Sequence, residues 1–237
     1  MSPQTSPRAG GKRHALTEVG LVLGFYVIYT FVRNMFGSAG VGSDVALANA
    51  RELIEFERSL NLYVELDVQR LFIDWDGFIW SSNIFYGTFH FVVTPAVLVW
   101  LFVHHQADYA RLRTTLLATT GLALIGFTIF PVMPPRLLGS CGPYGGCVPS
   151  GFVDTIAEVG GVWSFESKSV QSVSNQFAAV PSLHMAWALW CSAALAARVR
   201  SRSLLPLISL YPLATLFAIV VTANHYWIDA VLGALTL

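Results

Sequence analysis

The chain has 237 residues, of which 54% are hydrophobic and 12% charged, about half the charged share of an ordinary soluble domain. So few charges cannot cover the apolar surface, so the composition excludes a soluble enzyme and a disordered chain and predicts an integral membrane protein. Lys+Arg and Asp+Glu balance at 14 each, which gives no basic footprint for nucleic acid. Three cysteines are too few for a disulfide-built scaffold.

Six apolar stretches set the expected fold. A membrane-spanning helix needs roughly 20 apolar residues, and the last stretch is too short at about 1.5 Å per residue to cross fully. We therefore expect an all-α fold, a polytopic helical bundle with about six transmembrane helices, as one domain over residues 15–237 behind a tail of residues 1–14. The stretches are 19–32, 84–103, 114–132, 181–197, 204–222 and 225–237.

Basic residues predict the orientation of the bundle. They gather in the tail 1–14 and in the connections 104–113 and 198–203. If the six spans alternate in direction, these three segments lie on the same side of the membrane. By the positive-inside rule this side is the cytoplasm. An N-terminal signal peptide is the alternative for the first stretch, but Arg33 beyond its apolar core favours an uncleaved span.

Two long segments then fall on the outer side. Segment 37–80 carries apolar residues at helical spacing among charges, which predicts two amphipathic helices that lie in the membrane interface or pack on the bundle. Segment 134–180 is polar and glycine-rich, and is too long for an idle connection, so it is a candidate lid or binding loop. Cys141 and Cys147 in this loop are candidates for a disulfide, since the outer compartment is oxidising.

Polar motifs beside the spans carry the candidate chemistry, because ionisable groups near a membrane need a reason. The expected topology brings the first three motifs to the same outer surface, which predicts a shared site. The motifs are Pro134-Pro135-Arg136, Pro181-Ser182-Leu183-His184, His225 with Asp229, and Asn83 with Tyr86 and His90 on one helix face.

Each of these residues has a chemical role that it could fill. Asp229, four residues after His225, would fix the imidazole tautomer and leave the lone pair of the other nitrogen free to attack. His184 lies near a helix N-terminus, where Ser182 and free N–H groups could bind phosphate and the imidazole could protonate a leaving alkoxide. Arg136 would hold phosphate oxygens. The structural alternatives are a His–Asp bridge, a core histidine and a headgroup anchor.

Supporting roles are expected for a second group of polar residues. His90, Tyr86 and Asn83 are candidates for a layer behind the reacting groups, and Lys168 lies in the outer loop, where solvated charge is the default interpretation. No group of His, Cys, Asp and Glu has the spacing of a metal site, so no metal and no cofactor are expected.

The motifs PSLH and H-x-x-x-D resemble the type 2 phosphatidic acid phosphatase superfamily, whose pattern is K-x6-R-P, P-S-G-H and S-R-x5-H-x3-D. The resemblance covers roughly residues 80–237 and keeps His184, His225, Asp229 and Arg136. The departures resemble the branch of inositol phosphorylceramide synthase, an inositol phosphotransferase, and its bacterial relatives, in which P-P-R, P-S-L-H and N-H-Y-x-x-D recur. The departing residues are Ile129, Leu137, Leu183, Ala218 and Ile219.

The resemblance implies a metal-free double displacement on a membrane lipid phosphate. His225 would form a phosphohistidine that Asp229 orients, His184 would protonate the leaving group and then activate the acceptor, and water or a polyol such as inositol would accept. The site would face outward from the plasma membrane. Two rival functions are a haem-binding electron-transfer bundle, which would use His90, His184 or His225 as ligands, and a transporter with a midplane site.

Overall fold

The computed structural model describes residues 8–35, 41–161 and 175–237, and within these ranges the chain is helical without strands. The helices are α1 (Arg8–Met35), α2 (Ser43–Ser59), α3 (Glu65–Phe72), α4 (Asp76–His104), α5 (Gln106–Ile129), α6 (Pro135–Leu138), α7 (Thr155–Glu158), α9 (Leu183–Ala196), the 3-10 turn η1 (Arg202–Leu204), α10 (Leu205–Val221) and α11 (Trp227–Leu235). This confirms the all-α expectation.

Three helices, not six, are long and apolar enough to cross a membrane among the described residues. They are α4, α5 and the helical stretch Arg202–Val221. The apolar part of α1, Leu16–Val32, and the 14-residue α9 are shorter apolar helices. At about 1.5 Å per residue α9 measures about 21 Å, against a hydrocarbon core of about 30 Å. The predicted boundaries also shift, since α1 begins inside the predicted tail and α4 begins at Asp76 rather than at residue 84.

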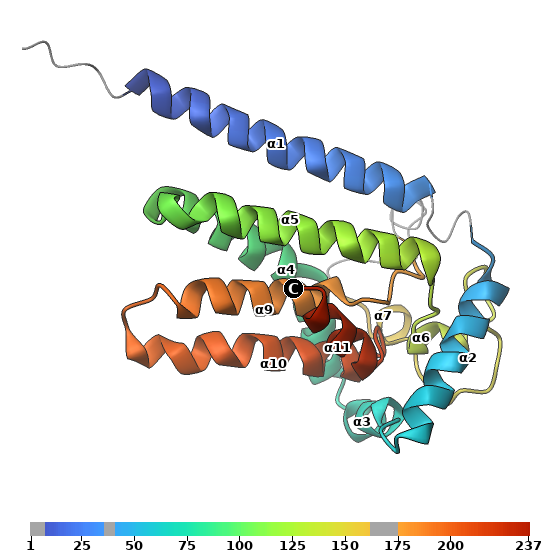
Figure 1. Cartoon of the computed structure of the whole chain (residues 1–237). Coiled ribbons are helices and arrows are strands. Elements are labelled where there is room, and N and C mark those ends of the chain that lie inside the picture. The colour runs from blue at the N-terminus through green and yellow to red at the C-terminus, as the bar shows by residue number, and fades with distance from the viewer. Residues whose placement is uncertain (1–7, 36–40, 162–174) are drawn as a thin grey trace, which may run out of the picture.

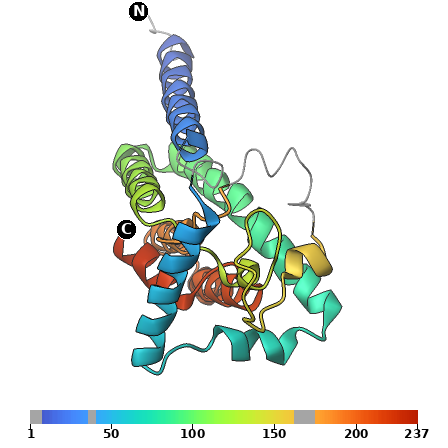
Figure 2. The same ribbon diagram turned by 90° about the vertical axis from the view of Figure 1, so that its right-hand side faces the viewer.

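The long helices run side by side, and their connections separate to two ends (Figure 1). The α4–α5 turn and the connection 197–204 lie at one end, while α2, α3, α6, α7 and α11 gather at the other. Figure 2 looks onto this second end, where the helices outside the bundle surround the ends of α4, α9 and α10. The predicted sorting of basic turns and polar motifs to opposite ends therefore agrees with the arrangement of the helices.

Segment 37–80 contributes two helices, as predicted, and α2 packs on the bundle end. Ala46, Ala50 and Leu53 of α2 are buried in a cluster with residues of the long loop and the turn before α11. That cluster includes Met133, Phe152, Phe177 and Tyr226. A buried apolar face stabilises a helix by about 25 cal/mol per Å² removed from water. These segments therefore share one core, which holds the described parts of the loop, residues 134–161 and 175–180, against the helix ends.

Candidate active site

The side chains of His225 and Asp229 are hydrogen-bonded to each other, as their spacing predicts. Asp229 Oδ2 lies 3.0 Å from His225 Nδ1 and accepts the Tyr226 backbone N–H at 3.0 Å. The reason differs from the prediction, because α11 begins at Trp227 and His225 lies in the turn before it. Both side chains are buried, with Asp229 fully enclosed. The carboxylate fixes Nδ1, so Nε2 is the nitrogen left for chemistry.

His184 lies beside His225 in the first turn of α9. The two imidazole centroids are 5.4 Å apart. The ring of Tyr86 on α4 stacks on His184 at 4.4 Å, and His90 meets it edge-on at 4.2 Å. The direct contact between His90 and His184 leaves no space for a haem between them. The predicted supporting residues Tyr86 and His90 thus hold His184 from the α4 side.

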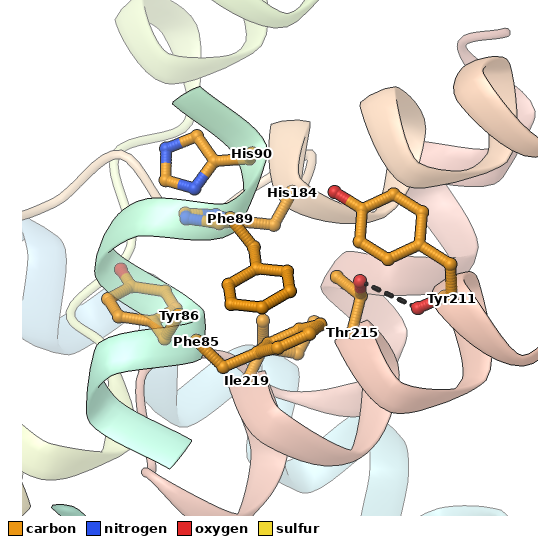
Figure 3. Close-up of a pocket in the computed structure, with 8 residues that line it drawn as sticks. All are labelled: Phe85, Tyr86, Phe89, His90, His184, Tyr211, Thr215 and Ile219. Atoms are coloured by element: carbon orange, nitrogen blue, oxygen red, sulfur yellow. Dashed lines mark hydrogen bonds between the residues drawn. The ribbon is translucent and has the colours of Figure 1, made fainter. Parts of the chain in front are cut away.

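Figure 3 shows the apolar surroundings of His184, a small pocket between α4 and α10. The rings of Phe85 and Phe89 on α4 face Tyr211, Thr215 and Ile219 on α10, and His90 and His184 close one side. The Thr215 hydroxyl donates to the Tyr211 carbonyl at 2.9 Å, so this hydroxyl is satisfied within α10. His184 therefore stands between an apolar pocket and the polar groups around His225.

Arg136 is held by three side chains from separate parts of the chain. Its Nε donates to Asn224 Oδ1 at 2.9 Å, Nη1 pairs with Asp154 Oδ2 at 2.8 Å and Nη2 donates to Gln176 Oε1 at 2.5 Å. Its own backbone N–H donates to the Ala223 carbonyl at 2.8 Å. These contacts fix the guanidinium beside the turn that carries His225.

A hollow of about 60 Å³ is lined by both Arg136 and His225. That volume exceeds the roughly 10–15 Å³ that one water molecule needs on the same measure, so the hollow can hold a larger polar group. A cation, an imidazole and several amides face one space, which is suited to an anion with hydrogen-bonding oxygens. Its lining residues are Tyr86, Pro134, Arg136, Asn175, Gln176, Ala178, Ala179, Asn224 and His225.

Two predicted residues have structural contacts. Ser182 is fully buried and caps α9, its hydroxyl accepting the Met185 N–H at 3.5 Å, so α9 begins two residues after the expected start at Pro181. The Asn83 amide donates to the carbonyls of Thr155 and Gly160 at 2.9 and 2.7 Å, which holds α7 next to α4. Lys168 lies outside the described residues.

A disulfide closes a short stretch of the loop that follows α6. Cys141 and Cys147, the predicted pair, are joined by a disulfide. Within the described ranges no three His, Cys, Asp or Glu residues come together as a metal site.

Sequence reasoning missed Asp154 and Gln176, which orient Arg136. Neither residue lies in a recognisable motif, and each meets Arg136 only through the path of the loop. Asn224 belongs to the motif N-H-Y-x-x-D, which marked it as a motif member without giving it a role. The one available signal was chemical: a buried arginine needs a carboxylate beside it to balance its charge, which pointed to an acidic partner without saying which residue it is.

Residues 51–237 match the model of one protein family, the PAP2 superfamily. This match confirms the superfamily that the sequence motifs resemble, while the inositol phosphotransferase branch stays a prediction. No curated protein and no solved structure matches the chain.

Proposed function

The chain belongs to the PAP2 superfamily, and on that premise we propose that it is a membrane-bound enzyme that cleaves or transfers a phosphoryl group carried by a lipid. The apolar helices are consistent with an integral membrane protein. The reacting lipid phosphate would enter the hollow between Arg136 and His225, with its phosphorus facing His225 Nε2.

The first step forms a covalent intermediate. The Nε2 lone pair of His225 attacks phosphorus while the bond from phosphorus to the lipid oxygen breaks. His184 gives its proton to that oxygen, so the leaving group departs as an alcohol. Asp229 stabilises the positive imidazole ring that results, and Arg136 stabilises charge on the phosphoryl oxygens.

The second step returns the enzyme to its starting state. His184, now neutral, takes a proton from the acceptor hydroxyl, whose oxygen attacks phosphorus and displaces His225. Water as the acceptor gives free phosphate, and an alcohol gives a new phosphoester. The amides of Asn175, Gln176 and Asn224 line the hollow, and this favours a hydroxyl-rich polyol as the second candidate acceptor.

One observation supports this proposal most directly: three segments far apart in sequence bring Arg136, His184 and His225 to one place. The 3.0 Å contact of His225 with Asp229 and the 5.4 Å separation of the two imidazoles suit a nucleophile beside a general acid. A purely structural His–Asp bridge has no need of an arginine in the same hollow as His225 or of a second imidazole packed beside it.

The experiment incubates purified protein with labelled lipid phosphates, with and without polyols, and follows free phosphate, new lipid and acid-labile phosphoenzyme. We expect turnover that EDTA leaves intact and that vanadate, a mimic of five-coordinate phosphorus, inhibits. His225→Ala should abolish turnover and phosphoenzyme together, whereas His104→Ala, an exposed histidine at the opposite end of α4, should change neither. Turnover lost in EDTA and restored by zinc would contradict the mechanism.

A further inference from the structure

Glu57 on α2 and Glu65 on α3 are fully buried carboxyl groups that neither predicted motifs nor the proposed mechanism use. Burying a charge is costly unless the group is paired and hydrogen-bonded. The cost calls for a reason in the function or in the architecture of this end of the molecule.

Both carboxyl groups bind the first turn of α11. Glu65 Oε1 accepts the Trp227 N–H at 3.0 Å, and Glu57 Oε1 accepts the Ile228 N–H at 3.3 Å. These are the first two residues of α11, whose N–H groups have no partner within the helix. Negative groups at this position also favour the helix dipole. With Asp229 on the Tyr226 N–H, three carboxyl groups hold three consecutive backbone amides directly after His225.

The remaining oxygens indicate that the pair shares a proton. Glu57 Oε2 and Glu65 Oε2 are both buried without a hydrogen-bond partner among the described residues when both groups are treated as acceptors. Two carboxylates cannot bond each other, but one proton between them lets a carboxyl donate to a carboxylate. Burial and the adjacent charge of Glu65 raise the pKa of Glu57 to about 9, and burial raises the pKa of Glu65.

Other charged groups around the pair are few. Arg58 and Tyr63 face it from the α2–α3 side, and Tyr226 and Asp229 from the α11 side. Arg58 lies over the ring of Tyr63, 4.8 Å from its centroid. No lysine or arginine forms an ion pair with either glutamate among the described residues, which leaves a shared proton as the compensation.

We propose that Glu57 and Glu65 are positioning residues which, sharing one proton, hold the first turn of α11 so that His225 presents Nε2 to the phosphoryl group. The proposal rests on the proposed function for its catalytic consequence. Loss of the shared proton adds a second negative charge to the pair, whose charge is felt by Asp229, and the repulsion loosens the turn that carries His225.

The test compares leucine and glutamine variants at both positions with Glu55→Leu and Glu55→Gln, matched controls at an exposed position of α2. We expect Glu57→Leu and Glu65→Leu to lower kcat by about 100-fold, the scale of a 1 Å misplacement of a reacting group. The KM for the lipid phosphate should change little, because Arg136 is untouched. Glu57→Gln should recover most of this kcat, since its amide oxygen still accepts the Ile228 N–H.

The pH profile supplies a readout that a merely structural role would not move. Wild-type kcat should fall above about pH 9, while in Glu57→Gln the amide N–H replaces the shared proton and cannot be lost. The alkaline limb of that variant should move up by at least one pH unit. This comparison needs only the wild type and Glu57→Gln, so it tests the proposal even if the leucine variants fail to fold.

Two results would overturn the proposal: folded leucine variants with the kcat of the Glu55 controls, or an alkaline limb unchanged in Glu57→Gln. Hydrogen exchange at the Trp227 and Ile228 amides, faster in the leucine variants, tests the positioning without any substrate. If the wild-type protein converts no lipid phosphate but exchange at these amides is still faster in the leucine variants, the proposed function is refuted. The positioning of α11 by Glu57 and Glu65 is then still supported.

Discussion

Gly233 of α11 lies directly on the backbone of Ser182, so close that a Cβ atom at position 233 would stand 2.3 Å from the Ser182 carbonyl oxygen. The Ser182 N–H also donates to the Asp229 carbonyl at 2.9 Å. This contact joins the start of α9, which carries His184, to the helix that follows His225. The separation of the two histidines therefore depends on a glycine remote from the reacting atoms.

Gly233→Ala should lower both stability and activity. The methyl group would force α11 away from α9, and overpacking of this kind costs about 1–3 kcal/mol. We expect kcat to fall by at least about 10-fold, because the two imidazoles separate. Unfolding in detergent and steady-state kinetics measure the two effects.

Gly121→Ala on α5 is the matched control, since no atom lies within 4 Å of a Cβ at that position. There the change should stabilise the helix by about 0.5–1 kcal/mol and leave turnover unchanged. Equal behaviour of the two variants would mean that the contact with Ser182 does not set the geometry of the site.

Arg136→Lys should fail to replace the arginine although it keeps the charge. One ammonium group cannot contact Asn224, Asp154 and Gln176 in the directions that the guanidinium serves. We expect kcat/KM to fall by about 100- to 1000-fold, the range found for the loss of one group that stabilises developing charge. Arg111→Lys, 74% exposed in its side chain, should leave kcat/KM unchanged, and a wild-type value in Arg136→Lys would remove Arg136 from the site.

The site should face the outside of the cell. Glu158 is exposed on α7 and Arg111 is exposed near the start of α5, and these two elements lie at opposite ends of the bundle (Figure 1), so both positions suit an introduced cysteine. A membrane-impermeant thiol reagent should label Glu158→Cys in intact cells, and Arg111→Cys only after lysis. The native Cys191 is buried and should contribute little background. Reversed labelling would place the site in the cytoplasm.

The sequence motifs named side chains that the structure brings together, but they did not name the partners of those side chains. Arg136, His184, His225 and Asp229 stand in short motifs, and alternating spans were enough to place them at one end. Their pairing was expected from a shared helix face, yet His225 precedes α11 and reaches Asp229 through the turn. The local spacing was informative even though the secondary structure was different.

The remaining parts of the site depend on the tertiary path of the chain. Asp154 and Gln176 meet Arg136 across 18 and 40 residues, and Glu57 meets Ile228 across 171. No periodic pattern encodes such contacts, because they form between loops and helix ends. The count of six spans stays a prediction for a related reason: α9 and α11 are short apolar helices, and hydropathy alone cannot separate packing on the bundle from crossing a membrane.

Glu57→Gln should change the pH dependence of stability. The pKa of Glu57 is raised from 4.5 to about 9 in the folded protein, so the folded state holds a proton that the unfolded state releases. The stabilisation is fully present below about pH 4.5 and is lost as the pH rises toward about 9. The free energy of unfolding of wild type should therefore fall relative to that of Glu57→Gln across this window and run parallel above it. Parallel curves throughout would show that Glu57 is ionised in the folded state.

His184→Ala should distinguish the role of His184 from that of His225, because the variant should still react with one class of substrate and not with another. A lipid alkoxide is a poor leaving group and requires a proton, whereas an aryl phosphate departs without one. His184→Ala should therefore still form phosphoenzyme from an aryl phosphate while it loses most turnover of a lipid phosphate. Dephosphorylation also slows, because the same residue activates the acceptor, so phosphoenzyme should accumulate.

Asp229→Asn serves as the intermediate case in the same assay. It keeps the shape of the pair with His225 but stabilises the positive imidazole less, so turnover should lie between wild type and His225→Ala with either substrate. Rapid quench with the aryl substrate measures the formation and the decay of the phosphoenzyme separately. Phosphoenzyme in His225→Ala together with none in His184→Ala would reverse the assignment, since the covalent bond would then form on His184 and His225 would carry the proton.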